Sequence, residues 1–513
     1  MVQPLILAID QGGQSSRVAI YTKTGECLHS FSAACTTTHE FINGVEHIEQ
    51  SPRDILLGIK ACIEKITAVL GDDVKNIVAA GFAGQGSSLV CWDNKTGEAL
   101  SPVLSWQDTR GDQYLKNISL SHSQAQHISG LRVSPHYGAS KIRWCLNNNP
   151  LVAYAYHNKS LSIGPIVSYV FWHLLNTNVV DPGHAQRTLL WNLQKNNWDD
   201  SLLTLFNIPK AILPQCQYHN SHFGDLALNQ YTTGQHTIPF TACARDQGAS
   251  LFARGIPEKA AYYINIGTGA FIQRLSEDMH APEGLLVSPL WLPQNKVEVD
   301  IIEVASPTCY ASELTDVFKI SSQKRLYAWE ATVNGAAAAI SFLQEHTGMQ
   351  ITPSEINTAL ALNPDYECYF LNAIGGLSAP YWRTDLQSQF SENISAHEKI
   401  LAWLESIIFQ ITVNVHLMNQ LGIAHKIYIS GGISKADGLC QKLADLLRVP
   451  VYRSENTDAT LQGIACMAAA IPQQWEYLAE EDVFQPQPNL SLLKAFGVWQ
   501  NSMNQWLSTK NSK

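Results

Sequence analysis

The sequence lacks an excess of positive charge, and it lacks the paired cysteines of a zinc site or a disulfide framework. Its 34 Lys and Arg residues are outnumbered by 44 Asp and Glu residues, giving a formal net charge of −10 at pH 7. Nucleic acids and anionic membranes attract basic surfaces, so this balance argues against both as partners. The eleven cysteines include no CxxC pair. We therefore expect buried, reduced thiols.

Long hydrophobic runs and a targeting segment are also missing. We find no apolar stretch that approaches the roughly 20 residues of a membrane span, and no basic residue precedes the first apolar run. The histidines show no spacing typical of metal ligands. These absences predict a cytoplasmic protein with no membrane partner.

What is present is the composition of a folded protein, with 45% apolar and 15% charged residues over 513 positions. A chain of this length is too long for one hydrophobic core, so we expect two large domains. We place the domains at residues 1–254 and 255–472, and we expect residues 473–513 to form a peripheral C-terminal tail.

The opening stretch, Leu5–Tyr21, predicts a hairpin with a turn of small residues. An apolar run of strand length ends at Asp10, the turn Gln11–Ser16 follows, and the chain is then apolar again. A turn without bulky side chains leaves backbone N–H groups free to bind a phosphate, with Asp10 placed to hold Mg2+. An ordinary hairpin would show the same pattern, and this stretch alone favours that simpler interpretation.

The same pattern returns near the start of the second half. Tyr262–Ile266 and Phe271–Arg274 are predicted strands on either side of the turn Gly267-Thr268-Gly269. Two such hairpins would be able to hold a polyphosphate from both sides of an interdomain cleft. Two further predicted strands end in small-residue loops, at Ala83–Ser88 and Gly431-Gly432. Ligands of α/β sheets bind at such strand ends.

Helical patterns cover Asp54–Leu70, His397–Leu421 and Leu461–Ile471. The Ala-rich stretch Glu330–Leu343 also predicts a helix. Asp246 stands where a further small-residue helix begins, so it is either a helix N-cap or a general base. Taken alone, the position favours the cap.

A set of residues concentrated at turns has an order and spacing that make chance implausible. The set includes Asp10-Gln11-Gly12, Ser15-Ser16-Arg17, Trp106-Gln107, Lys141, Arg187-Thr188, Asp246-Gln247, Gly267-Thr268-Gly269, Glu330, Ala379-Pro380-Tyr381-Trp382 and Gly431-Gly432. Taken in this order, the residues resemble the FGGY carbohydrate kinases over roughly residues 5–470.

The resemblance implies an α/β fold of two ribonuclease-H-like domains of the actin/hexokinase type, with ATP and a small sugar or polyol meeting in the cleft. It implies that Asp10 holds Mg2+ and that Asp246 is the catalytic base. The residues implied to bind ATP are Gly12, Gly13, Gln14, Ser15, Arg17, Gly267, Thr268, Gly269, Gly431 and Gly432. Those implied to bind the substrate are Gln85, Gly86, Trp106, His136, Asp246 and Gln247.

The substrate side departs from the family members that phosphorylate glycerol. Those members carry Thr-Thr where this chain has Gly13-Gln14, an Arg-Glu pair where it has Gly86-Ser87, and a Tyr where it has His136. Arg245 stands where a Gly usually precedes the Asp. We expect Gly86 to open space for a larger substrate, such as a ketose or a longer polyol.

We interpret the chain as an ATP-dependent kinase of a sugar or polyol other than glycerol. Two alternatives remain. One is a kinase of glycerol itself, which the overall similarity favours. The other is a catalytically weak nucleotide-binding regulator, which Gly13-Gln14 keeps open and which the pair Asp10 and Asp246 argues against. The sequence leaves the oligomeric state open, a homo-oligomer included.

Overall fold

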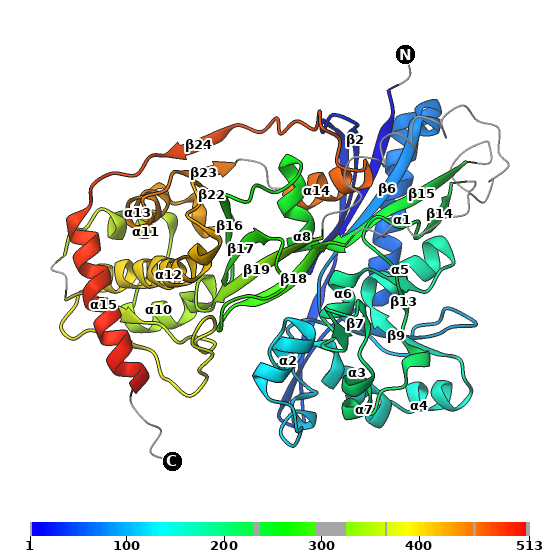
Figure 1. Ribbon diagram of the computed structural model, residues 1–513, viewed down its shortest axis with the longest axis horizontal. Helices are drawn as coiled ribbons and strands as arrows, with labels where there is room; N and C mark the ends of the chain where they lie inside the picture. The colour runs from blue at the N-terminus through cyan, green and yellow to red at the C-terminus, as the bar shows by residue number, and fades with distance from the viewer. Residues whose placement is uncertain (1–2, 229–235, 293–324, 365–366, 455–457, 509–513) are drawn as a thin grey trace.

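The computed structural model describes residues 3–228, 236–292, 325–364, 367–454 and 458–508. They form two α/β halves, each built around a twisted sheet (Figure 1). The first sheet has the strand order β14-β15-β6-β1-β2-β3, in which β6 runs parallel to β1 and to β15. Its strands are β1 (Leu5–Gln11), β2 (Ser15–Thr22), β3 (Cys27–Ala34), β6 (Ile77–Gly84), β14 (Gly224–Ala227) and β15 (Thr237–Arg245).

The second sheet repeats this order. Its strands follow the sequence β18-β19-β17-β16-β22-β23-β24, with β16, β22 and β23 parallel and an antiparallel hairpin at β16–β17. The five-strand core of each sheet therefore has the same topology, which confirms the predicted pair of ribonuclease-H-like domains. The strands are β16 (Ala261–Ile266), β17 (Ala270–Ser276), β18 (Leu286–Trp291), β19 (Leu326–Val333), β22 (Lys426–Ser430), β23 (Val451–Ser454) and β24 (Glu481–Phe484).

Insertions into the first half carry a smaller five-stranded sheet, ordered β4-β5-β8-β7-β9, and a group of short helices. The strands are β4 (Thr37–Ile42), β5 (Val45–Gln50), β7 (Leu89–Asp93), β8 (Val103–Leu104) and β9 (Leu161–Pro165). Two short pairs, β10 (Val179–Val180) with β13 (Gln215–Cys216) and β11 (Trp191–Asn192) with β12 (Asn197–Trp198), complete the strands of this half. The helices are α2 (His122–Ser129), α3 (Gly138–Asn148), α4 (Pro150–His157), α5 (Ile166–Leu175), α6 (Pro182–Gln186), α7 (Asp200–Phe206) and α8 (Asp246–Ser250).

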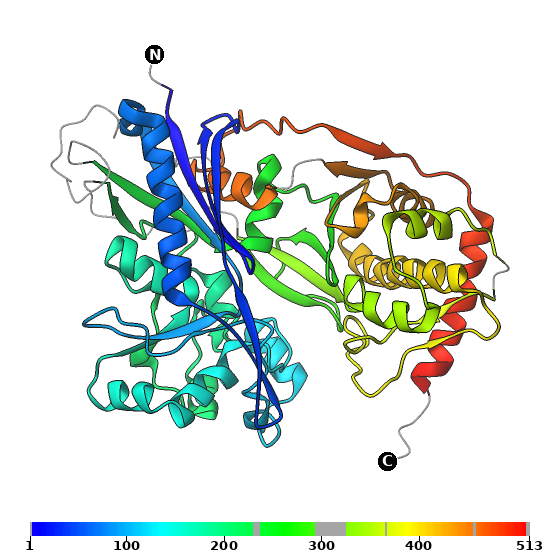
Figure 2. The same ribbon diagram turned by 180° about the vertical axis from the view of Figure 1, so that it is seen from behind.

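Helix α1 (Pro52–Leu70) covers one face of the first sheet (Figure 2). It begins at Ser51, whose hydroxyl accepts a hydrogen bond from the Asp54 N–H, and Pro52 occupies the first turn. Its apolar residues recur at helical spacing, and Ile55, Ile59 and Ile63 are buried. They pack with Leu5, Leu7 and Ile9 of β1 in one core.

Helix α14 (Ala459–Ala468) covers the opposite face of the same sheet, although it lies near the end of the chain. Leu461 and Ile464 pack with Ile6 and Ala8, the β1 residues that alternate with those facing α1. The helix approaches very closely, because a Cβ added at Gly463 would lie 1.8 Å from the Ala249 carbonyl oxygen of α8. Small residues at this crossing are therefore required by the packing.

The core of the second half is centred on α12 (Ala396–Met418), which starts with a capping box formed by Ser395 and Glu398. The helical stretch Ala396–Leu421 contains an 18-residue window with a mean hydropathy of 1.5, and the stretch is long and apolar enough to cross a membrane. This corrects the expectation that no apolar segment approaches that length. Since 83% of the window is buried inside the protein, its apolar surface is accounted for by the core.

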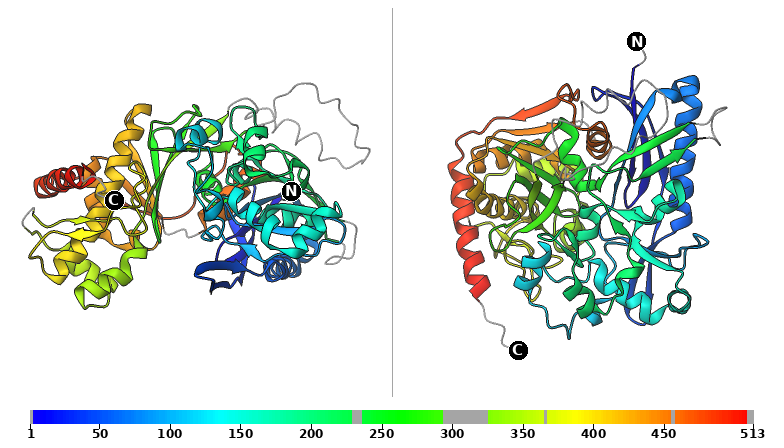
Figure 3. Two further views of the ribbon diagram at one scale, coloured as in Figure 1. Left: turned by 90° about the horizontal axis from the view of Figure 1, so that it is seen from below. Right: turned by 45° about the vertical axis from the view of Figure 1, so that its right-hand side comes forward.

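The remaining helices of this half pack around α12 or line its outer side. Figure 3 shows α15 running along the side of the second half that faces away from the first half. The elements are α10 (Ile340–Thr347), α11 (Pro353–Leu360), α13 (Asp437–Leu447) and α15 (Leu490–Ser508), with the strand pair β20 (Phe370–Leu371) and β21 (Gln389–Phe390).

The segment predicted as a C-terminal tail is folded onto the second half. Strand β24 pairs with β23 at the edge of the sheet, and α15 buries Trp499 and Met503 in the second core. The indole N–H of Trp499 donates to the Phe370 carbonyl at 3.1 Å. The segment therefore contributes to the core of that half.

The predicted helix at Glu330–Leu343 is wrong at its start. Glu330 lies in β19, between β17 and β18, and the helix begins only at Ile340 after a short 3-10 turn. The aromatic residues Tyr327 and Trp329 favour a strand, and pairing on both sides outweighs the helix propensity of the alanines that follow.

Replacing Gly463 by Ala should destabilise the fold, because the added Cβ would collide with the Ala249 carbonyl. Overpacking of this kind costs about 1–3 kcal/mol, so the urea midpoint followed by Trp fluorescence should fall. Gly497 within α15 has nothing within 4 Å of the same position, so Gly497→Ala should leave the midpoint unchanged or raise it. Equal midpoints for Gly463→Ala and the wild type would contradict the close crossing.

Candidate active site

The carboxyl ends of three neighbouring parallel strands bring the predicted catalytic residues together. In the strand register, Asp10 of β1 lies beside Ala83 of β6, and Arg245 of β15 lies beside Gly84. Asp10, the loop after β6 and Asp246 therefore share one edge of the first sheet, which is where α/β folds bind their ligands.

Asp10 has one oxygen paired and one without a partner. Its Oδ2 accepts hydrogen bonds from Arg17, whose guanidinium also pairs with Asp458. Its Oδ1 is buried, and no hydrogen bond reaches it in the described part of the chain. Burial raises the pKa of Asp10 to about 6, against the charge of Arg17. An orphaned, buried carboxylate oxygen suits a bound cation, so the residues present fit the Mg2+ that the sequence predicts. Arg17 neutralises Asp10 in this structure and is not free for a phosphate.

Asp246 is the first residue of α8 and not its cap. Arg245 occupies the N-cap position, and among the described residues the Asp246 carboxylate accepts only the Gln247 N–H, at 2.7 Å. The N-cap alternative is therefore wrong. Burial raises the pKa of Asp246, while the Gln247 N–H and the charge of Arg245 counteract this in part. A carboxylate whose pKa is raised toward neutrality is suited to accept a proton from a hydroxyl.

A buried charge cluster joins the two halves directly beside Asp246. Glu330 of β19 accepts hydrogen bonds from Arg187 after α6 and from Arg245, the latter at 2.8 Å. Gln273 of β17 donates to the same carboxylate at 2.9 Å, and Arg187 also donates to Ser288 of β18 at 2.8 Å. Burial alone would raise the pKa of Glu330, but Arg187 and Arg245 outweigh it and lower the pKa to about 2.

The space beside Gly86 is filled, which corrects the expectation that this glycine opens room for a substrate. A Cβ added at Gly86 would lie 3.1 Å from Cδ of Arg245 and 3.3 Å from Cγ of Arg187. The stems of the two arginines therefore pack over the glycine. The small residue makes room for the charge cluster and not for a larger sugar.

Gln85 was predicted to bind substrate, but its amide is buried and already partnered. The Nε2 group donates to Gln11 at 3.1 Å and to Gln50 at 2.7 Å, and Oε1 accepts from Ser88 at 3.0 Å. These bonds tie together the loops after β1, β5 and β6. Gln85 thus positions the loops and presents no free group to a ligand.

Trp106 and His136, both predicted to bind the substrate, are in contact through the Trp106 backbone. Trp106 is 40% exposed, and the His136 ring contacts its carbonyl at 3.2 Å. Solvent reaches His136, yet the surrounding protein and the charge of Lys141 lower its pKa. Lys141 is itself buried and donates to the carbonyls of Ser105 and Ser87, and burial lowers its pKa to about 7.

The glycine turns of the second half also meet. The Gly267–Gly269 turn closes with a hydrogen bond from the Gly267 N–H to the Gly269 carbonyl at 2.9 Å. Gly431 ends β22 with φ +101°, and a Cβ there would lie 2.4 Å from the Ile266 carbonyl. Only glycine fits this approach, which places Gly431 against the Gly267 turn.

The turn of the first half makes equivalent bonds. The Gly12 N–H donates to the Ser15 carbonyl at 2.9 Å, and Gln14 is exposed. The Gly13 carbonyl accepts from Thr37 and Gln50. These bonds hold the Gly12–Ser15 backbone in a fixed turn next to Asp10.

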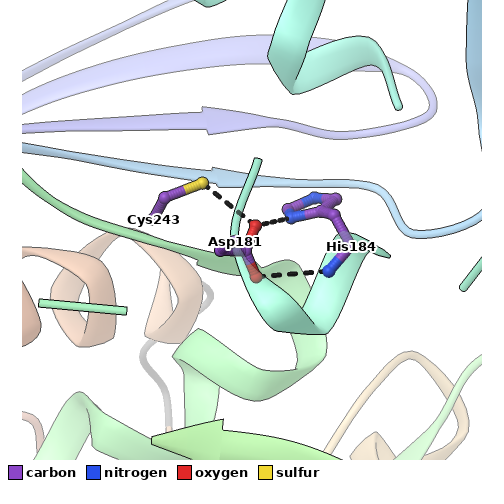
Figure 4. Close-up of side chains that lie close together, drawn as sticks. All are labelled: Asp181, His184 and Cys243. Carbon is purple, nitrogen blue, oxygen red and sulfur yellow. Dashed lines mark hydrogen bonds and ion pairs between the residues drawn. The ribbon is translucent and has the colours of Figure 1, made fainter. Parts of the chain in front are cut away.

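At the end of β6, the side chains of Asp181, His184 and Cys243 form a buried cluster (Figure 4). Their candidate ligand atoms lie within 4.8 Å of one another, the distance range of a metal site. Each group is nevertheless hydrogen-bonded already: His184 and the Cys243 thiol donate to Asp181, and the second ring nitrogen of His184 faces the Gly84 carbonyl at 3.2 Å. The cluster supports the end of β6 from behind.

Comparison with known proteins decides the family. The sequence pattern of the N-terminal domain of the FGGY family of carbohydrate kinases matches residues 5–253, and that of the C-terminal domain matches residues 262–471. The chain belongs to this family. It is a carbohydrate kinase, and FGGY kinases use ATP.

Known kinases are similar to this chain over nearly its whole length, both in sequence and in structure. A glycerol kinase of Citrifermentans bemidjiense is 30% identical over 94% of this chain and 94% of that protein. The structure of Plasmodium falciparum glycerol kinase with ADP has a TM-score of 0.81 at 22% identity, covering 99% of both chains. The ligand-bound xylulose kinase of Lactobacillus acidophilus has a TM-score of 0.80 at 18% identity, with the same coverage. The FGGY fold thus accommodates different sugars and polyols.

Two members of the charge cluster were not recognised as site residues from the sequence. Arg187 and Glu330 appear in the resemblance but receive no role there, because their contact joins positions 143 residues apart. The sequence gives an indication only for Glu330, which is a charged residue inside an otherwise apolar stretch, Leu326–Val333. Buried charges of this kind are almost always paired.

Replacing Glu330 by Gln should strongly destabilise the protein near neutral pH. The change leaves two buried arginines without their counter-charge, which costs about 3–5 kcal/mol. The folded pKa of Glu330 lies below its ordinary value of 4.5, so its contribution is complete above that pH and is lost as the pH falls toward 2. The difference in urea midpoint between wild type and Glu330→Gln should therefore shrink on acidification.

The matched control is Glu277→Gln, which removes a carboxylate that pairs with Lys259 at the surface. Such exposed pairs contribute about 0–1 kcal/mol, so its midpoint should stay near that of the wild type. A Glu330→Gln protein as stable as Glu277→Gln at pH 7 would show that the cluster does not hold the halves together.

Proposed function

We propose that this FGGY kinase transfers the terminal phosphoryl group of ATP to a hydroxyl of a small sugar or polyol other than glycerol. The observation that supports the proposal is the partly buried carboxylate of Asp246, which shares the edge of strand ends with Asp10. Phosphoryl transfer needs mainly positioning, charge neutralisation and one group that accepts the substrate proton. This edge of the sheet contains residues suited to each of these tasks.

In the proposed reaction, Asp246 accepts the proton of the attacking hydroxyl, and Gln247 beside it orients a neighbouring hydroxyl. The exposed face of Trp106 packs against the C–H face of the sugar, and His136 hydrogen-bonds a hydroxyl. The Gly12–Ser15 and Gly267–Gly269 turns, with Gly431 and Gly432, bind the nucleotide. Mg2+, held near Asp10 when bound, neutralises phosphate charge.

We propose a substrate other than glycerol because the polar groups around Gly86 differ from those of the family members that phosphorylate glycerol. A guanidinium lies next to Gly86, but it belongs to Arg245 and is bonded to Glu330. Ser87 and His136 stand where glycerol-phosphorylating members carry a Glu and a Tyr. A substrate therefore meets a different pattern of donors and acceptors. Glycerol kinase activity is the second candidate, favoured by the similarity to glycerol kinases over most of the chain.

Asp246→Asn should lower kcat by about 10²–10⁴-fold, the usual loss when a general base is removed, while ATP binding is retained. The measurement is steady-state turnover with calorimetry of ATP binding. In the wild type, kcat/KM should fall at low pH with an apparent pKa above the ordinary value of 3.8, since the pKa of Asp246 is raised.

Asp200→Asn is the control for Asp246→Asn. Asp200 also begins a helix, α7, but it is exposed, so its replacement should leave kcat unchanged. If Asp246→Asn turns over as fast as Asp200→Asn, Asp246 takes no part in the chemistry.

Glycerol should be a poor substrate in a screen of ATP consumption over ketoses, aldoses and polyols. A hydrogen bond to a charged group contributes about 1.5–3 kcal/mol, so losing one or two reduces kcat/KM roughly 10-fold to well over 100-fold. Asp246→Asn provides the background rate. If glycerol is the best substrate, the protein is a glycerol kinase. If no compound is turned over, a nucleotide-binding regulator is favoured.

A further inference from the structure

A polar pocket of about 340 Å³ lies at the border between the two halves, away from the residues described above. Its walls come from α2 and Arg132 in the first half, and from the connection before β18 in the second half. In Figure 1, α2 occupies this border below β18. Segments of both halves of the chain therefore form the pocket.

The pocket is separated from the catalytic site by strand β18. Val287 lines the pocket, whereas the next residue, Ser288, accepts the hydrogen bond from Arg187. Successive side chains of a strand point to opposite faces, so the pocket and the charge cluster lie on opposite sides of β18. A ligand of the pocket would not compete with a substrate at Asp246.

Two opposite charges, Arg132 and Glu283, line the pocket. Within the described residues, neither the Arg132 guanidinium nor the Glu283 carboxylate makes a hydrogen bond or an ion pair. Arg132 lies over the ring of Trp382 at 5.3 Å, and burial lowers its pKa while the charge of Glu283 opposes the shift. Glu283 is exposed and Arg132 is partly buried. A guanidinium partly withdrawn from water retains a strong demand for hydrogen bonds.

The other walls provide neutral polar groups and apolar contact. Gln126, His127 and Ser123 of α2 line one side, and Met279 and Val287 line the other. The charges of Arg132 and Glu283 balance, so the pocket offers strong donors and strong acceptors with no net charge. That combination suits hydroxyl groups, which donate to a carboxylate and accept from a guanidinium.

We propose that this pocket is a second ligand site, which binds a small neutral polyhydroxy compound between Arg132 and Glu283. Hydrogen bonds next to the pocket connect the two halves. The Val287 N–H donates to the Gly130 carbonyl at 3.0 Å, and Gln126 donates to the Leu285 carbonyl at 2.7 Å. A ligand here contacts both halves and stabilises the arrangement that forms the pocket. The site goes beyond the proposed function, since it requires no phosphorylation.

The test uses Met279 as a local reporter. The chain has only 6 Met residues, so ¹³C-methyl methionine labelling gives a simple NMR spectrum, in which Met279→Leu assigns the Met279 signal. Xylitol, sorbitol and glucose are titrated as neutral probes, with gluconate and inorganic phosphate as anionic probes. We expect a saturable shift of the Met279 signal with at least one neutral probe and a weaker response to the anions.

Glu283→Gln and Arg132→Gln should each weaken that binding about tenfold or more, because each removes a charged hydrogen-bonding partner. Glu98→Gln, which changes an exposed carboxylate outside the pocket, should bind as the wild type does. An unresponsive Met279 signal, a preference for the anions, or unchanged affinity in both pocket variants would overturn the proposal. Because the readout needs no turnover, a failure of the proposed kinase reaction would be seen separately.

Discussion

A single carboxylate from the second half, held between two arginines of the first, is the contact on which the rest of the site depends. Glu330 is buried with Arg187 and Arg245, and no water is needed to satisfy its oxygens because Gln273 also donates to it. Removing charges from water is costly, and the loss of one partner would leave the others buried and unpaired. The Nε atoms of Arg187 and Arg245 are already buried without a hydrogen bond among the described residues. It therefore fixes how the two sheets meet, and it fixes the backbone that leads into Asp246.

The same cluster connects two neighbouring loops of the proposed site to the second half. Arg245 and Gly86 are complementary, because the long residue of β15 packs over the small residue after β6. Arg245 in turn donates to Glu330 of the second half. A change at Gly86 or Arg245 therefore constrains the other position and also the contact between the halves.

Local periodicity was sufficient to predict the two hairpins, α1 and α12, whereas the gathering of Asp10 and Asp246 was predicted only through the resemblance to the FGGY family. It was insufficient for Glu330, Gln85 and Gly86. Glu330 was assigned to a helix, since the alanines after it dominate the local propensity, whereas its pairing partners lie far away in the chain. Gln85 and Gly86 were assigned to the substrate, since nothing local shows that Gln50 and Arg245 already occupy the groups and the space beside them.

The position of α14 has a consequence for how the protein is made. The first sheet is translated early, but one of its faces is covered by a helix that ends at Ala468. Most multidomain chains complete each domain as it leaves the ribosome. Here the core around Ile6 and Ala8 also includes Ala249, Leu251 and Phe252 of the first half, but it is completed by α14 only when nearly the whole chain has emerged. The first half alone therefore lacks part of its core and is an incomplete folding unit.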